Sequence, residues 1–159
     1  MRLIDAYADL ASALDRAAGD AAQDGGARLT SVVGAYRDWA LAEPHRYRLL
    51  FRAPLQGYDA QSTNLVEAAQ PAMNVVLNVV SGLARPGTPV PQGTESQFQE
   101  WMRHHGVTHV STEAASRTTL LWAHLHGLVS LEIEGNFTSM GIDPAPLYEA
   151  EVRECVGSL

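Results

Sequence analysis

The stretch LLWAHLHGLVSLEIEG, residues 120–135, decides how this chain folds. Its apolar positions form two stripes, with Trp122, His126, Val129 and Ile133 in one and Leu121, Leu125 and Leu128 in the other. Repeats of three and four residues predict a helix, and a helix with two apolar stripes must contact more than one neighbour. His124 and His126 are two positions apart, so they point to different sides of the helix and cannot chelate one ion.

Three interpretations of residues 120–135 compete. They are a metal or catalytic site, an ordinary core helix, and a helix that builds both a subunit interface and a ligand cavity. For His126, a core imidazole held by a hydrogen bond and a pocket-lining imidazole carry about equal weight, because a buried polar group needs a partner in either case.

The remainder of the chain also has helical periodicity. Segments with helical start and stop signals are predicted at 2–18, 28–43, 44–51, 64–84, 94–105 and 111–135, and from Asp143 onward. No stretch alternates with period two for long enough to predict a strand. The sequence therefore predicts an all-α fold of about seven helices, with residues 1–159 forming a single domain.

Local signals predict several helix ends. Thr94 and Gln97 have the spacing of a capping box, and Ser111 and Asp143 are positioned to cap the helices that follow them. Pro71 lies inside the predicted helix over 64–84, where it removes a hydrogen bond and predicts a kink or a broken start.

Composition excludes several classes of function. The formal net charge is −7 and no lysine occurs, which opposes binding of nucleic acid or an anionic membrane by these residues. The single cysteine, Cys155, excludes an intramolecular disulfide and fits a small core residue. No secretory signal follows Met1, and no apolar run reaches the ~20 residues that span a bilayer. We expect a cytoplasmic protein with no membrane partner.

Signatures of catalysis are weak. No G-x-S-x-G motif and no glycine-rich phosphate loop occurs. The alternative to a binding protein is a small helical-bundle, metal-dependent enzyme that uses the region of His104, His105 and His109. Gly106 is expected to end the helix that carries the first two, so the three histidines need not share a face. We predict no enzyme, no cofactor and no metal.

Two motifs resemble a known family. Trp122 is followed by His126 and Gly127 and then by Gly135, and residues 35–51 contain the run Tyr-Arg-x-Trp-Ala-x-x-x-Pro-x-x-Tyr-x-x-x-Phe. In this order the motifs resemble the C-terminal regulatory domain of TetR-family transcriptional regulators, in the subtype named for its W, H and G. The resemblance extends over roughly residues 28–157.

The resemblance implies a homodimer. In this family the last two long helices pack against those of a second copy in a four-helix interface, which agrees with the two apolar stripes of residues 111–135. The side chains predicted for the interface are Leu121, Leu125, Leu128, Tyr148, Val152 and Cys155.

The resemblance also implies a ligand pocket enclosed by the preceding helices, with Trp122 and His126 facing the interior. Asn74 and Asn78, one turn apart in the helix over 64–84, fit a cavity with a few orienting polar groups. The alternative, that both side chains face solvent, carries at least equal weight. The predicted pocket residues are Trp122, His126, Met73, Asn74, Trp39, Tyr36 and Met102. We expect a small apolar or aromatic effector, whose identity the sequence does not give.

Family members begin with a three-helix DNA-binding module of about fifty residues. This sequence has no such segment, and residues 1–20 resemble the connecting helix that follows the module. DNA contact is therefore expected only through that N-terminal module. The predicted function is an effector-binding and dimerisation domain of a bacterial transcriptional regulator, which couples a small-molecule ligand to DNA binding.

Overall fold

A computed structural model of the chain describes residues 3–20, 24–51, 63–83 and 89–157. Within these ranges the fold consists of helices and contains no strand. The helices are α1 (Leu3–Asp20), α2 (Gly25–Ala42), α3 (Pro44–Phe51), α4 (Thr63–Ser81), α5 (Glu95–His104), α6 (Thr112–Ile133), α7 (Asn136–Met140) and α8 (Ala145–Val156). The predicted all-α class is confirmed, and α7 is the one described helix that the periodicity did not predict.

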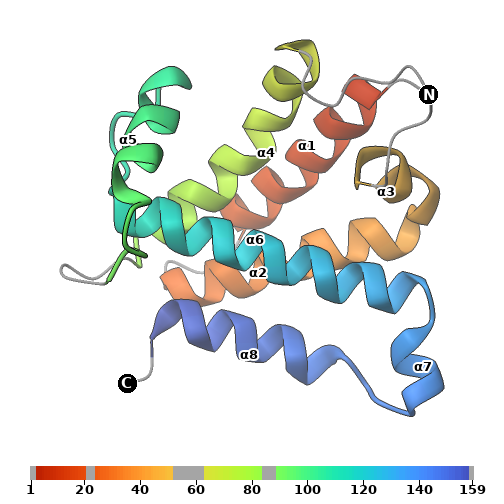
Figure 1. The fold of residues 1–159 in the computed structure, drawn as a ribbon. Helices are drawn as coiled ribbons and strands as arrows, with labels where there is room; N and C mark the ends of the chain where they lie inside the picture. Colours follow the sequence, from red (N-terminus) through yellow and green to blue (C-terminus); the bar gives the residue numbers. More distant parts are fainter. Residues whose placement is uncertain (1–2, 21–23, 52–62, 84–88, 158–159) are drawn as a thin grey trace.

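The long helix α6 crosses the whole molecule and organises the other elements around it (Figure 1). It packs against α2, α4 and α8, and α1 packs against α2 and α4. The short helix α7 connects α6 to α8, so these two helices lie beside each other on one face (Figure 1). A single helix therefore contacts neighbours on several sides, as its two apolar stripes predicted.

The buried side chains form two separate hydrophobic clusters. The larger cluster joins α1, α2, α3, α4, α6 and α8 and contains Leu10, Leu14, Leu29, Tyr36, Val80, Leu121, Leu125 and Val129 among others. The smaller cluster, made of Leu77, Met102, Val110, Ala114 and Ala115, holds α5 against α4 and the first turns of α6. The space between the two clusters is therefore a seam in the core.

The predicted helix ends were partly right. Ser111 caps α6, because its side-chain oxygen accepts a hydrogen bond from the Ala114 N–H at 3.1 Å. The Asp143 side chain accepts from the Ala145 N–H at 3.1 Å, although α8 begins one residue later than predicted. The capping box at Thr94 was wrong: its hydroxyl donates to the Pro91 carbonyl at 2.6 Å and makes no cap hydrogen bond.

Pro71 does not interrupt α4. The helix is continuous from Thr63 to Ser81, and Pro71 lies on its exposed side. A predicted break in the start of this helix is therefore absent from the residues that the structure describes.

Two glycines fix the turn that joins α6 to α8. Gly135 and Gly141 flank α7 with φ angles of 82° and 69°. These are left-handed conformations, which glycine adopts without the steric penalty that a Cβ brings. The left-handed backbone conformation at Gly135 thus explains why glycine occupies the last position of the motif that begins at Trp122.

Candidate ligand cavity and candidate subunit surface

A cavity of about 280 Å³ lies at the seam between the two hydrophobic clusters. Tyr7, Phe51 and Trp122 in its wall belong to the larger cluster, and Met73 and Trp101 belong to the smaller one. The complete described lining is Tyr7, Phe51, Val66, Ala69, Gln70, Ala72, Met73, Trp101, His105 and Trp122.

Five helices contribute to this wall. Gln70 and Met73 are three positions apart on α4, and Trp101 and His105 are four apart at the end of α5, so each pair shares one side of its helix. Aromatic rings dominate: Trp122 contacts Phe51 at 6.1 Å between ring centroids, and Phe51 contacts Tyr7 at 6.3 Å. The cavity is apolar with a few polar groups, which is the usual composition of a ligand site.

The structure brings together only part of the predicted pocket set. Trp122 and Met73 line the cavity directly. Asn74 lies one step behind the wall, where its side-chain oxygen accepts a hydrogen bond from the Gln70 amide at 2.8 Å. The buried Tyr36 ring lies behind Trp122, with 5.3 Å between the ring centroids.

Two other predicted pocket residues lie elsewhere. Met102 is buried in the smaller cluster, and its neighbour Trp101 faces the cavity instead. Trp39 is buried against α1, where its indole N–H donates to the Asp9 carboxylate at 2.9 Å. The same carboxylate accepts from Arg46 at 2.8 Å, so Asp9 ties α1 to both α2 and α3.

Sequence reasoning missed the other described lining residues: Tyr7, Phe51, Val66, Ala69, Gln70, Ala72, Trp101 and His105. Phe51 was available as a signal, because it closes the motif of residues 35–51. Nothing in the sequence places α1 and α5 on opposite sides of the same space.

His126 lies beside this wall and is held by a hydrogen bond. Its Nδ1 is 2.6 Å from the Tyr47 hydroxyl, which is also 3.2 Å from the Ser130 hydroxyl. The imidazole packs against Phe51 with 5.1 Å between the ring centroids. Burial lowers the pKa of His126 below its ordinary value, so the neutral ring is favoured.

The Tyr36 hydroxyl is buried without a hydrogen bond to any described residue. The side chain is 1% exposed, and burial, with the nearby Tyr47, raises the pKa of Tyr36 far above its ordinary value. This phenol therefore remains neutral and serves as a core ring between α2 and α6.

A polar cluster links α2, α6 and α8 on the other side of Tyr36. Arg37 donates two hydrogen bonds to the Glu132 carboxylate, at 2.9 and 2.8 Å. Tyr148 donates to the same carboxylate at 3.0 Å, and the guanidinium lies 4.6 Å from the Tyr148 ring centroid. The hydrogen bonds that Arg37 donates to Glu132 are the main reason that the pKa of Arg37 is raised. The Glu132 carboxylate on α6 thus holds α2 and α8 to α6.

The stripe predicted for the subunit interface is buried in the chain itself. Leu121 and Leu125 are 2% and 3% exposed, and Tyr148, Val152 and Cys155 are also buried in the larger cluster, while Leu128 is half-buried. These side chains pack between α6, α2 and α8 because α8 folds back onto α6 within one chain. The exposed positions of α6 are therefore other residues.

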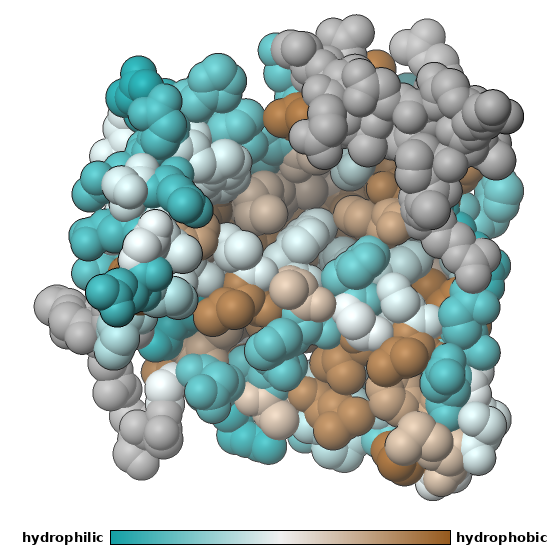
Figure 2. Space-filling view, in the orientation of Figure 1, coloured by the Kyte–Doolittle hydropathy of each residue, from teal (hydrophilic) through white to brown (hydrophobic). Residues whose placement is uncertain are grey.

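We call those residues the outer stripe: Leu120, Ala123, His124, Gly127 and Leu131, all exposed on α6. Leu120 is 53% exposed and Leu131 is 44% exposed. A Cβ at Gly127 would meet no heavy atom within 4 Å. On this face, apolar side chains alternate with hydrophilic ones over α6 and α8 (Figure 2).

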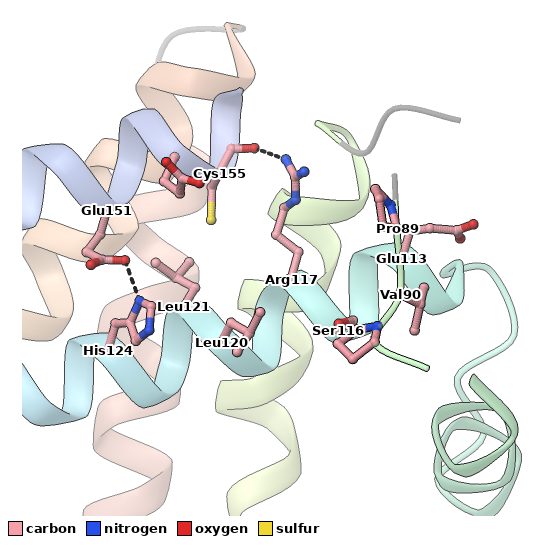
Figure 3. Close-up of a pocket in the computed structure, with 12 residues that line it drawn as sticks. Pro89, Val90, Glu113, Ser116, Arg117, Leu120, Leu121, His124, Glu151 and Cys155 are labelled. Atoms are coloured by element: carbon pink, nitrogen blue, oxygen red, sulfur yellow. Dashed lines mark hydrogen bonds and ion pairs between the residues drawn. The ribbon is translucent and has the colours of Figure 1, made fainter. Parts of the chain in front are cut away.

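A groove of about 390 Å³ runs beside the outer stripe, between α6, α8 and residues 89–91 (Figure 3). His124 Nδ1 lies 2.8 Å from the Glu151 carboxylate across it, and Arg117 donates to the carbonyl oxygen of Cys155. Burial raises the pKa of the Cys155 thiol to about 11, so the thiol is neutral and unreactive. Cys155 is the small core residue that the sequence predicted.

The histidines of the enzyme alternative do not converge on a metal site. His104 is exposed, His105 packs against Trp101 with 5.4 Å between the ring centroids and the rings tilted by 51°, and His109 Nε2 lies 3.1 Å from the Asn78 side-chain oxygen. Over the described ranges, no group of three His, Cys, Asp or Glu side chains could hold an ion.

Comparison with known proteins decides the family. The family model described as "Tetracyclin repressor-like, C-terminal domain" matches residues 29–155. The chain belongs to this family. The resemblance to the C-terminal domain of TetR-family regulators is thereby confirmed.

Relatives of this TetR-type domain are transcriptional regulators. The HTH-type transcriptional regulators Rv1816 of Mycobacterium tuberculosis and Mb1846 of Mycobacterium bovis are each 28% identical over 165 residues, which covers 99% of this chain and 70% of each relative. The protein is therefore a transcriptional regulator. The comparisons give the enzyme alternative no support.

Solved structures share the fold. The crystal structure of SCO4313, a protein described as regulatory, superimposes with a TM-score of 0.75 at 31% identity, over 98% of this chain and 70% of that one. A structure from Rhodococcus sp. RHA1 has a TM-score of 0.66 at 20% identity, over 97% of this chain and 67% of that one, and shows the fold alone. Among the described helices, none is long and apolar enough to cross a bilayer.

Proposed function

We propose that this TetR-type domain binds a small apolar or aromatic effector and holds two copies of the regulator together. The observation that carries the effector-binding part is the aromatic cavity at the seam between the two hydrophobic clusters. A ligand there would contact α1, α3, α4, α5 and α6 at once, and so would change how these helices are held together.

The regulatory consequence follows from differential affinity. A ligand that binds one arrangement of the helices better than another shifts the population toward it, by no more than that difference in affinity. The curated relatives are named HTH-type regulators. We extend that name to this protein: effector binding changes the separation of two helix-turn-helix modules, which read half-sites about 34–36 Å apart on DNA.

A thermal-shift screen with small apolar and aromatic compounds tests effector binding. A compound that binds only the folded chain raises Tm in a concentration-dependent way. In the variant Ala69→Phe, a ring added to the cavity wall should abolish the shift while the chain still folds. The matched control is Ala8→Phe, on the exposed side of α1, which should keep the shift. A shift that survives Ala69→Phe would place the ligand outside this cavity.

The outer stripe supports the dimerisation part of the proposal. It is an exposed row of apolar and small side chains with one histidine, His124, on the longest described helix, and Gly127 leaves open space at its centre. Packed helices approach to about 8–10 Å between axes, and small contact residues allow the shorter distances. A second copy would bury this row together with exposed parts of α8, in the four-helix arrangement expected for the family.

Sedimentation over a concentration series tests dimerisation. Leu131→Glu places a charge in the proposed interface and should yield a folded monomer. The matched control, Leu41→Glu, introduces the same change at an exposed leucine of α2, outside the outer stripe, and should remain a dimer. A Leu131→Glu variant that still sediments as a dimer would contradict the proposed interface.

A further inference from the structure

We infer that the cavity selects a neutral, planar aromatic molecule held between Trp101 and Trp122, with one polar group at its edge. The inference rests on the proposed effector-binding function and adds the chemical class of the ligand. Five of the ten described lining side chains are rings: Tyr7, Phe51, Trp101, His105 and Trp122.

The charges around the cavity favour a neutral ligand. None of the described lining residues is Asp, Glu, Lys or Arg. An ion moved from water into such a wall loses hydration and gains no opposite charge in return, which is costly. Aromatic faces do attract cations, so a planar cation has to be tested against a neutral ring.

The two indoles favour a flat ligand. Trp122 is backed by Tyr36 and Phe51, at 5.3 and 6.1 Å between ring centroids, which fixes one wall from the larger cluster. Trp101 is carried by α5 and packs against the smaller cluster. An aromatic molecule that contacts both rings would complete the core across the seam. A cavity of about 280 Å³ lies at the small end of ligand-site volumes, which suits one or two fused rings.

Gln70 and His105 supply the polar recognition. One amide N–H of Gln70 donates to Asn74 at 2.8 Å, which holds the side chain at the wall. Among the described residues, the amide oxygen and second N–H of Gln70 have no hydrogen-bond partner, so both can serve a ligand. His105 presents an imidazole that is steadied by Trp101. A hydroxyl, carbonyl or ring nitrogen at the edge of the ligand would satisfy these groups.

Two probes that share one carbon skeleton test the inference on the whole chain. Calorimetric titration would compare 2-naphthol with decahydro-2-naphthol, its saturated counterpart with the same hydroxyl. Contacts between aromatic rings add free energy beyond the burial of apolar area. We therefore expect 2-naphthol to bind about tenfold more tightly than its saturated counterpart. Equal affinities would overturn the aromatic inference and leave an apolar effector site in place. Failure of both probes to bind would overturn the effector-binding proposal as well.

Variants of the cavity wall test whether Trp101 causes the preference for an aromatic ligand, and a charged probe tests the preference for a neutral one. Trp101→Leu should remove the preference for 2-naphthol and leave decahydro-2-naphthol binding nearly unchanged, while Trp101→Phe should keep the preference. Trp39→Phe is the control, because its indole is bound to Asp9 away from the cavity. N-methylquinolinium, a planar cation, should bind more weakly than 2-naphthol. Tighter binding of the cation, or a preference that persists in Trp101→Leu, would overturn the inference.

Discussion

Leucines lie on both sides of α6, but their surroundings are very different. On the inner side, Leu121, Leu125 and Val129 are buried by α2 and α8 of the same chain. On the outer side, Leu120 and Leu131 are exposed. Leucine alone therefore does not reveal which side of a helix faces its own core. What distinguishes the sides is the fold of α8, which covers one stripe and leaves the other open.

The largest effect should follow from a charge on the inner side. Leu125→Asp buries an unpaired carboxylate in the larger cluster and removes a buried leucine, so we expect a loss of about 4 kcal/mol or more and an unfolded chain. Circular dichroism measures the loss of helix. A folded Leu125→Asp monomer would mean that this side of α6 faces a partner, and would contradict its assignment to the core of the chain.

The next effect concerns the polar cluster on the inner side. Arg37→Met removes the two hydrogen bonds that the guanidinium donates to the Glu132 carboxylate. We expect the free energy of unfolding to fall by about 1–3 kcal/mol. Urea denaturation gives the value. The matched control is Arg48→Met, whose pair with Glu134 is exposed at 3.2 Å and should contribute well below about 1 kcal/mol. Equal losses would show that the inner cluster has no special role.

The two glycines of the motif should respond in opposite directions. Gly127→Ala adds a methyl group to an open helical position, so we expect the isolated chain to gain up to about 1 kcal/mol. Gly135→Ala forces a Cβ onto a φ angle of 82°, and we expect a loss of about 1–2 kcal/mol. Thermal unfolding of the two variants at low protein concentration decides the matter, and changes of the same sign would be evidence against these different roles.

The smallest expected effect is a dependence of the chain's stability on pH that arises from His126. Burial lowers the pKa of His126 in the folded chain, while the unfolded chain takes up the proton near pH 6.5. The stability tied to the neutral ring is therefore present above about pH 6.5 and is lost as the pH falls toward the lowered pKa. The fall in Tm between about pH 7.5 and 5.5 should be smaller in His126→Gln than in the parent chain.

The control for this titration is His45→Gln, since His45 is exposed on α3. Its fall in Tm should match that of the parent. An unchanged fall in His126→Gln would mean that another group titrates.

The sequence predicted the helices well, because periodicity and caps such as Ser111 are local. Thr94 stands at the N-cap of α5 as predicted, but its hydroxyl donates to the Pro91 carbonyl, so the predicted capping hydrogen bond does not form. Met73 and Trp122 were predicted to line a pocket and do line the cavity. Trp101 could not be predicted, because α5 meets the cavity through tertiary packing that no local pattern records.

The same limit explains the interface stripe. Leu121 and Leu125 were chosen for a partner because the helix is apolar on two sides. Sequence periodicity shows that both sides of the helix must be buried, but it does not show which side is buried by the same chain. In the structure, Tyr148 and Val152 of α8 are buried in the same cluster as the inner side of α6, so this side is covered within the chain.

The shared hydrogen-bond acceptor Asp9 has a mechanical consequence. It holds α1 to Trp39 on α2 and to Arg46 on α3 through one carboxylate. Tyr7, two positions earlier, belongs to the cavity wall on another side of α1. Because one carboxylate accepts both hydrogen bonds, loss of Asp9 would release α1 from Trp39 of α2 and from Arg46 of α3 in a single step.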